Sequence, residues 1–145
     1  WMVVPQNHIR VVERLAQNLF ICSPHVSQVA ALEAMSCEHE LFHNIDIYRE
    51  NRQIIMDGLL NIGFQNFAPP DGAFYFYIDI SKYSDDSLSF CNDILQEVGV
   101  AITPGVDFDP ERGKTTIRIS YARSTDEIKQ GMIRLGQFMK KRGYF

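Results

Sequence analysis

The chain has 145 residues, of which 46% are hydrophobic and 22% are charged, and its formal net charge is −4. A chain of this length can form one compact domain that buries roughly two-thirds of its unfolded surface. The lysines and arginines are dispersed, which argues against a nucleic-acid partner, and no apolar run is long enough to predict a membrane span.

The three cysteines, Cys22, Cys37 and Cys91, are odd in number and far apart in the sequence. We therefore expect buried free thiols in a reducing cytoplasm rather than a disulfide framework. The amino-terminal residues lack the basic and apolar regions of a signal peptide. Because Trp1 is not a methionine and opens an apolar run, we expect the chain to be part of a longer protein.

The first part of the sequence is predicted to be mainly helical. Residues 1–4 are typical of the end of a buried strand, and residues 8–19 carry apolar residues at helical spacing. Ser23 followed by Pro24 predicts an N-cap and a first helical position for a second helix over residues 24–35. The side chains expected to face inward in that helix are Val26, Val29, Ala30 and Ala34.

A longer helical pattern covers residues 41–62 and should end at Gly63, where a left-handed cap is expected. Strands are then predicted over residues 73–80, 100–103 and 115–121, with a helix over residues 87–98. Ser124 and Glu127 form a capping box for a final helix. Helices followed by mixed strands and helices indicate an α+β unit that carries the tail of another domain at its front.

Residues 39–43, HELFH, match the H-E-x-x-H signature of zinc peptidases. His39 and His43 can share one face of a helix, as a zinc site requires. A catalytic zinc also needs a third protein ligand, usually from a separate element, and Glu50 lies on the same predicted helix. We therefore interpret the motif as the solvated start of a helix and predict no metal site.

Arg118 lies in the middle of a predicted strand, between Ile117 and Ile119. Burying an unpaired guanidinium is costly, so this side chain should have an anionic partner. One interpretation is a structural ion pair with a carboxylate of the chain. The other is a bidentate clamp for the carboxylate or phosphate of a ligand. Spacing alone does not separate the two.

Three motifs occur in order along the sequence: PDGAFYF at residues 70–76, VAITPGVDF at 100–108 and IRISYA at 117–122. With them, the chain resembles the C-terminal part of a fold-type I, class I/II pyridoxal-phosphate-dependent aminotransferase, of the aspartate aminotransferase superfamily. The resemblance covers essentially the whole chain. It implies an α/β fold class, with an α+β small domain over residues 45–145. A long linking helix would join this domain to the tail of the large cofactor-binding domain, residues 1–44.

The resemblance also implies roles for individual residues. In such aminotransferases the arginine of the matching R-I-S strand binds the α-carboxylate of the substrate, which assigns that role to Arg118. Pro104, Gly105 and Phe108 match the turn that approaches the substrate side of the site. Members usually have glycine after this phenylalanine, where the chain has Asp109. The implied partners are an amino acid and a 2-oxo acid, and the implied assembly is a cytoplasmic homodimer.

Such enzymes hold pyridoxal 5′-phosphate through a lysine Schiff base, and we expect that lysine upstream of Trp1. The chain has five lysines, none in the matching context: Lys82, Lys114, Lys129, Lys140 and Lys141. We therefore predict no catalytic and no cofactor-binding residue in this chain, which alone should be inactive. The alternatives are a pyridoxal-phosphate-dependent β-lyase or decarboxylase on the same scaffold, and a non-catalytic stand-alone domain.

Overall fold

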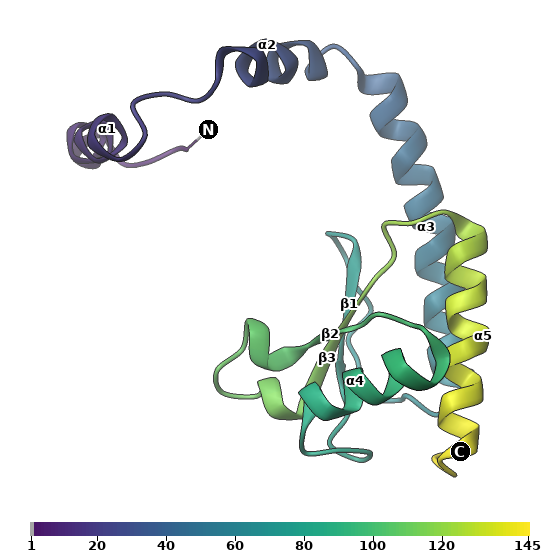
Figure 1. Ribbon diagram of the computed structural model, residues 1–145. Helices are drawn as coiled ribbons and strands as arrows, with labels where there is room; N and C mark the ends of the chain where they lie inside the picture. Colours follow the sequence, from purple (N-terminus) through teal and green to yellow (C-terminus); the bar gives the residue numbers. More distant parts are fainter. Residues whose placement is uncertain (1) are drawn as a thin grey trace. The chain divides into compact units, whose positions relative to one another are not determined.

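The computed structural model describes residues 2–145 and divides into two compact units, with the boundary between Phe42 and His43. Each unit is described by itself. The boundary falls inside the long helix α3 (Glu38–Asn61), which begins three residues earlier than the helical pattern predicted (Figure 1). The assignment of residues 1–44 to the tail of a large domain stays a prediction.

The first unit contains α1 (Gln6–Leu19), α2 (His25–Ala34) and the start of α3. The strand end expected at its front is wrong for residues 2–4, which have no regular secondary structure, and Trp1 lies outside the described residues. The predicted cap of α2 is also wrong by one position. Pro24 is itself the N-cap residue, and the helix has no side-chain cap hydrogen bond.

The apolar side chains of this unit are largely exposed, contrary to the inward orientation expected for α2. Val26 is 75% and Val29 47% exposed, and no residue of α1 or α2 is buried. Two short helices offer each other no sheet or third layer on which an apolar face can be covered. The expected burial of Cys22 and Cys37 is wrong for the same reason, whereas Cys91 is buried and all three thiols are free.

A three-stranded antiparallel sheet lies at the centre of the second unit, in the order β1-β3-β2. The central strand β3 (Thr116–Ser120) pairs with β1 (Tyr75–Asp79) and with β2 (Thr103–Pro104). Strand β2 is shorter and begins later than the predicted strand over residues 100–103. Pro104 has no N–H to donate, so it can lie only at the edge of the ladder. Two 3₁₀ turns, η1 (Gly105–Asp107) and η2 (Gly113–Thr115), connect β2 to β3.

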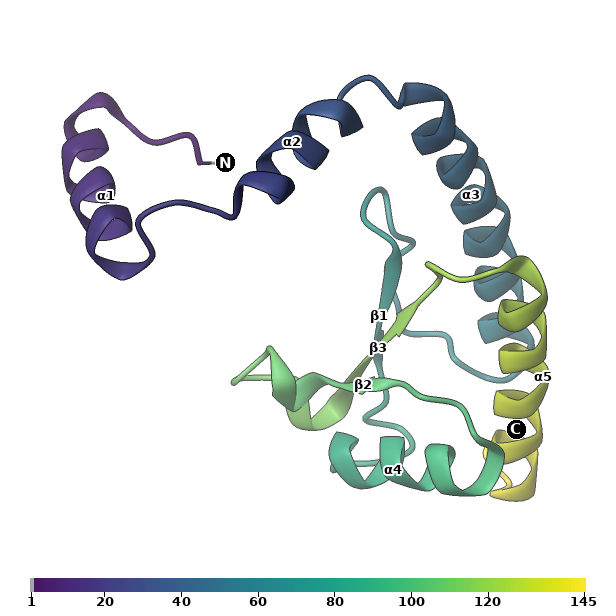
Figure 2. The same cartoon turned by 45° about the horizontal axis from the view of Figure 1, so that its top comes forward.

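Helix α4 (Ser87–Val98) has the predicted bounds, and α5 (Thr125–Lys141) begins with the predicted cap. Helix α4 ends at Gly99, which has the left-handed φ of 67° that favours glycine. Helix α5 begins with the predicted capping box of Ser124 and Glu127. Figures 1 and 2 show α5 beside the second half of α3. No helix in residues 2–145 combines the length and apolar character that a bilayer crossing requires.

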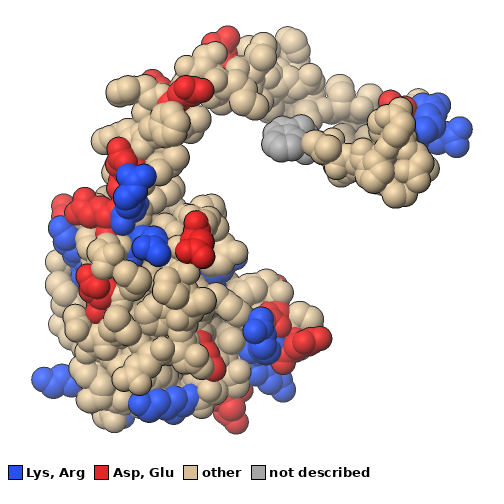
Figure 3. Space-filling view, turned by 180° about the vertical axis from the view of Figure 1, so that it is seen from behind, with Lys and Arg blue, Asp and Glu red and all other residues tan. Residues whose placement is uncertain are grey.

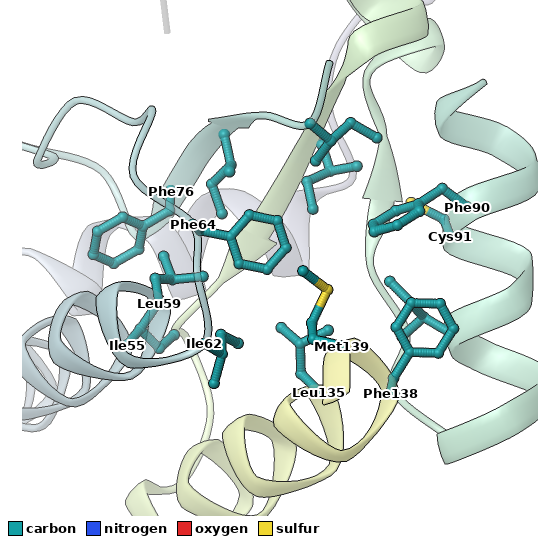
Figure 4. Packing of buried hydrophobic residues seen from close by; sticks show 14 of the residues in the cluster. Ile55, Leu59, Ile62, Phe64, Phe76, Phe90, Cys91, Leu135, Phe138 and Met139 are labelled. Carbon is teal, nitrogen blue, oxygen red and sulfur yellow. The ribbon is translucent and has the colours of Figure 1, made fainter. Parts of the chain in front are cut away.

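One hydrophobic core joins the sheet to α3, α4 and α5 (Figure 4). The rings of Phe90 on α4 and Phe138 on α5 meet edge to face, with centroids 5.7 Å apart. The core side chains include Ile55, Leu59, Phe64, Phe76, Ile78, Ile94, Ile117, Leu135 and Met139. Phe76, Ile78 and Ile117 come from one face of the sheet, so the opposite face carries the alternate side chains.

Charged side chains of both signs are interspersed on the face that Figure 3 shows. Ion pairs link α4 to the end of α5. Arg142 contacts Asp93 at 3.1 Å and also pairs with Glu97, and Lys141 contacts Glu97 at 2.6 Å. These acids and bases pair with one another rather than offering unpaired charge to a ligand, and exposed pairs of this kind add little to stability.

Candidate functional site

The sheet face opposite the core carries Arg118. In the sheet register Arg118 lies directly across from Tyr77 on β1 and from Thr103 on β2. Residues opposite each other in an antiparallel pair point to the same side, so these three side chains share one face. All three are half-buried. The strand thus presents its arginine beside two hydrogen-bonding side chains, while Ile117 anchors the other face.

Arg118 has no acidic partner among residues 2–145, since none of the ion pairs within 4.0 Å includes it. Its guanidinium carbon instead lies over two aromatic rings, 5.4 Å from the centroid of Tyr75 and 5.1 Å from that of Phe108. Cation–π contacts hold the group without using its N–H donors. Within the described chain, the structural ion pair considered for this arginine is not formed.

The turn before the site depends on a close approach of two glycines. A Cβ atom on Gly105 would lie 2.2 Å from Thr116 Oγ1 and 2.7 Å from the carbonyl oxygen of Gly113. Any larger residue would therefore displace the backbone of η2. Pro104, the residue before it, pairs with Ile117 at the edge of β3. Gly105 and Pro104 thus shape the turn, and Phe108 is the predicted site residue whose side chain lies against the guanidinium of Arg118.

Asp109 organises the loop after Phe108. Its carboxylate accepts hydrogen bonds from the backbone N–H groups of Glu111 and Arg112 at 3.1 and 3.0 Å. It also accepts from Arg112 Nε at 3.2 Å and from the Tyr77 hydroxyl at 2.7 Å. The backbone N–H of Arg112, followed by the Tyr77 hydroxyl, lowers the pKa of this carboxyl to about 2. Asp109 is therefore ionised at neutral pH.

Tyr77 connects this loop to the sheet. Burial raises the pKa of its hydroxyl, which stays protonated at neutral pH and donates to Asp109. The hydroxyl oxygen of Thr116 lies 2.7 Å from the hydroxyl oxygen of Tyr77. The ring of Tyr77 lies 5.6 Å from the ring of Phe108. Tyr75 and Tyr77 were missed as site residues in the sequence. Their positions two apart on a strand were the available signal, since such residues share a face.

The lysines of the chain do not fit a covalent cofactor site. All five are exposed. Lys141 pairs with Glu97 on the surface of the second unit, and Lys129 lies 4.0 Å from Glu50. A Schiff-base lysine needs a desolvated pocket that depresses its pKa and admits the cofactor. We therefore derive no catalytic step from a lysine of this chain.

The HELFH segment lies in the first turns of α3. Every residue from 39 to 43 is exposed. Within residues 2–145 no group of three or more histidine, cysteine, aspartate or glutamate side chains could hold a metal ion. His39 and His43 thus share a helix without a third ligand in the described part of the chain.

The motifs and the fold point to the same class of protein. Residues 1–135 match the family described as aminotransferase class I and II. The chain belongs to that family, which confirms the predicted resemblance. The known members that it resembles include enzymes and solved structures from several bacteria.

The chain is 43% identical over 141 residues to a valine–pyruvate aminotransferase from Mycobacterium tuberculosis, covering 96% of this chain and 36% of that protein. A crystal structure of an aminotransferase from Mycobacterium tuberculosis is 42% identical, with a TM-score of 0.89, and the match covers 97% of this chain and 37% of that one. A Silicibacter pomeroyi protein, provisionally called an aminotransferase, is 56% identical, with a TM-score of 0.89 and coverages of 97% and 38%.

The chain thus spans little more than a third of the length of these relatives. The matched third has the fold of their C-terminal domain, which confirms the predicted fold class. The roles of Arg118, Phe108, Gly105 and Pro104 are not tested by these similarities.

Proposed function

We propose that the full-length protein is a pyridoxal-phosphate-dependent aminotransferase that moves an amino group between an amino acid and a 2-oxo acid. Arg118 grips the α-carboxylate of the substrate. The observation that supports this role is the guanidinium held over Tyr75 and Phe108 with no carboxylate of residues 2–145 within ion-pair distance. A half-buried cation without an internal partner is suited to an anionic ligand.

The protein part of the mechanism is binding and orientation. The two rings contact the guanidinium through their faces, so its N–H donors stay free for both carboxylate oxygens. Holding the carboxylate in this way limits rotation of the substrate and orients its Cα–H bond. When bound to the full-length protein, pyridoxal phosphate would supply the electron sink that stabilises negative charge at Cα.

The direct test is substitution of Arg118 in the full-length protein. We expect Arg118→Ala to lower kcat/KM for the amino donor by roughly 10²- to 10⁴-fold, because removing one member of a desolvated charge pair costs about 3–5 kcal/mol. Arg118→Lys keeps the charge but loses the bidentate geometry, so it should recover only part of the loss. Arg134→Ala, on the exposed face of α5, is the matched control. Activity of Arg118→Ala within tenfold of wild type would refute the assignment.

Product analysis separates transamination from the related chemistries. Transamination requires a 2-oxo acid acceptor and returns a new amino acid, whereas β-elimination releases ammonia and decarboxylation releases carbon dioxide. A panel of amino donors with pyruvate as acceptor therefore distinguishes an aminotransferase from a lyase or decarboxylase, and a non-catalytic protein would give no product. The 145-residue chain alone should not develop a visible absorbance band with pyridoxal phosphate. The homodimer and the cytoplasmic location stay predictions.

A further inference from the structure

The loop between β2 and β3 contains an acidic residue beside a site proposed to bind an anion. An aspartate there should repel a substrate carboxylate unless its charge is balanced. The charge of Asp109 is balanced by its hydrogen-bond donors, among them Arg112 Nε at 3.2 Å. The side chain of Asp109 is only 16% exposed, so this arrangement is built into the loop rather than formed at its surface.

The same carboxylate is connected to Arg118 through two aromatic side chains. Asp109 accepts from the hydroxyl of Tyr77 at 2.7 Å, and the Tyr77 ring lies 5.6 Å from the ring of Phe108. Phe108 in turn lies 5.1 Å from the guanidinium carbon of Arg118. Tyr77 is also directly opposite Arg118 in the sheet. The contacts therefore run in an unbroken series from the loop carboxylate to the proposed substrate clamp.

The backbone supplies a second connection. Phe108 N–H and Asp109 N–H both donate to the carbonyl oxygen of Gly105, at 3.1 and 2.9 Å. The N–H of Gly113 donates to the carbonyl oxygen of Asp109 at 2.9 Å. Asp109 thus closes the turn on which Phe108 lies, while its side chain secures the residue against which the Phe108 ring packs.

We infer that Asp109 is a positioning residue for substrate binding, which acts through Tyr77 and Phe108 to hold the guanidinium of Arg118 in its carboxylate-binding orientation. The inference rests on the proposed function. It assigns Asp109 no contact with substrate and no proton transfer. Its effect is on how well the carboxylate is bound, and so on KM rather than on the chemical step.

The test is Asp109→Asn in the full-length, cofactor-loaded protein. Asparagine keeps the size and one acceptor oxygen but cannot accept charge-assisted bonds from both Tyr77 and Arg112. We expect KM for the amino donor to rise about tenfold, the order of effect of one lost charge-assisted hydrogen bond, with kcat within about threefold of wild type. The inhibition constant of 3-methylbutanoate, a carboxylate without an amino group, should rise by a similar factor. Glu111→Gln, an exposed acid in the same loop, is the matched control.

Tyr77→Phe provides an independent variant that removes only the hydroxyl. It should also raise KM. The KM of the double variant should be no higher than about that of the more impaired single variant, because both changes break the same Tyr77–Asp109 hydrogen bond. If Asp109→Asn fails to fold, Tyr77→Phe alone tests the inference, through KM for the amino donor and the inhibition constant of 3-methylbutanoate.

The outcomes separate this inference from the proposed function. Activity that survives Arg118→Ala would overturn both. Loss of activity in Arg118→Ala with unchanged constants in Asp109→Asn and Tyr77→Phe would overturn only the positioning role. A fall in kcat and in melting temperature, with KM and the inhibition constant unchanged, would show that Asp109 serves stability alone and would also overturn it.

Discussion

Asp109 shows how one side chain can serve a loop and a neighbouring site together. Two backbone N–H groups, a guanidinium and a phenol all donate to its carboxylate. Each of these bonds favours the ionised form, which is why the pKa of Asp109 falls to about 2. A glycine at this position would have no side chain to make such bonds.

The lowered pKa of Asp109 predicts a contribution to acid stability. The pKa falls from 3.8 to about 2 on folding, so the ionised carboxylate stabilises the fold fully above about pH 4, and this contribution is lost as the pH falls toward 2. In Asp109→Asn it is absent at every pH. Urea unfolding at pH 6, 4, 3 and 2 measures the free energy of unfolding of both proteins. The difference between wild type and Asp109→Asn should narrow as the pH falls from 4 to 2. A gap that stays constant down to pH 2 would contradict the assigned pKa.

Helix α5 is defined by residues close together in the sequence. Ser124 accepts the N–H of Glu127, and the Glu127 carboxylate accepts the N–H of Ser124, so two donors of the helix start are satisfied by neighbours in the sequence. Its core-facing side chains, including Leu135 and Phe138, recur at helical spacing. Local caps and one apolar stripe are sufficient to define this helix, which is why the pattern predicted it.

The cap of α5 should be measurable in the stability of the chain. Ser124→Ala removes the side-chain oxygen that accepts the N–H of Glu127, so we expect a loss of about 1 kcal/mol in the free energy of unfolding. Ser89→Ala is a suitable control because Ser89 is exposed within α4 and should change stability by less than about 0.5 kcal/mol. Chemical denaturation of the three proteins gives the comparison. Equal stabilities for Ser124→Ala and wild type would mean that the cap is unimportant.

Across the whole molecule, burial differs sharply between the two units. The second unit contains every buried hydrophobic residue of the described chain, whereas α1 and α2 bury none. Hydrophobic stabilisation is proportional to the apolar area removed from water. We therefore expect the second unit to account for nearly all of the cooperative unfolding of this chain.

A pair of leucines tests that expectation. Leu59 is 0% exposed in the second unit and Leu15 is 56% exposed in the first. In the 145-residue chain, Leu59→Ala should cost about 2–5 kcal/mol of unfolding free energy, whereas Leu15→Ala should change it by less than about 0.5 kcal/mol. Urea denaturation measures both. Similar losses for the two variants would show that the first unit contributes to the same cooperative core.

Local chemistry accounts for what could be predicted. The capping box of Ser124 and Glu127 and the bounds of the helix over residues 87–98 depend on residues within a few positions, and both predictions were confirmed. The alternation around Arg118 predicted a strand whose flanking isoleucines face away from it. The short strand β2 was misplaced because its pairing depends on β3, which lies more than ten residues later in the chain.

By itself, the sequence determined the succession of helices and strands in the second unit, the aminotransferase motifs and the place of Arg118 within a strand, since these depend on periodicity and on residue type. Only the tertiary structure decided that Arg118 lies over Tyr75 and Phe108 rather than against a carboxylate, and that Asp109 bonds to Tyr77. It also decided that Cys22 and Cys37 are exposed. The physical reason is that burial and side-chain pairing are set by contacts between residues far apart in the chain, and no local pattern encodes those distances.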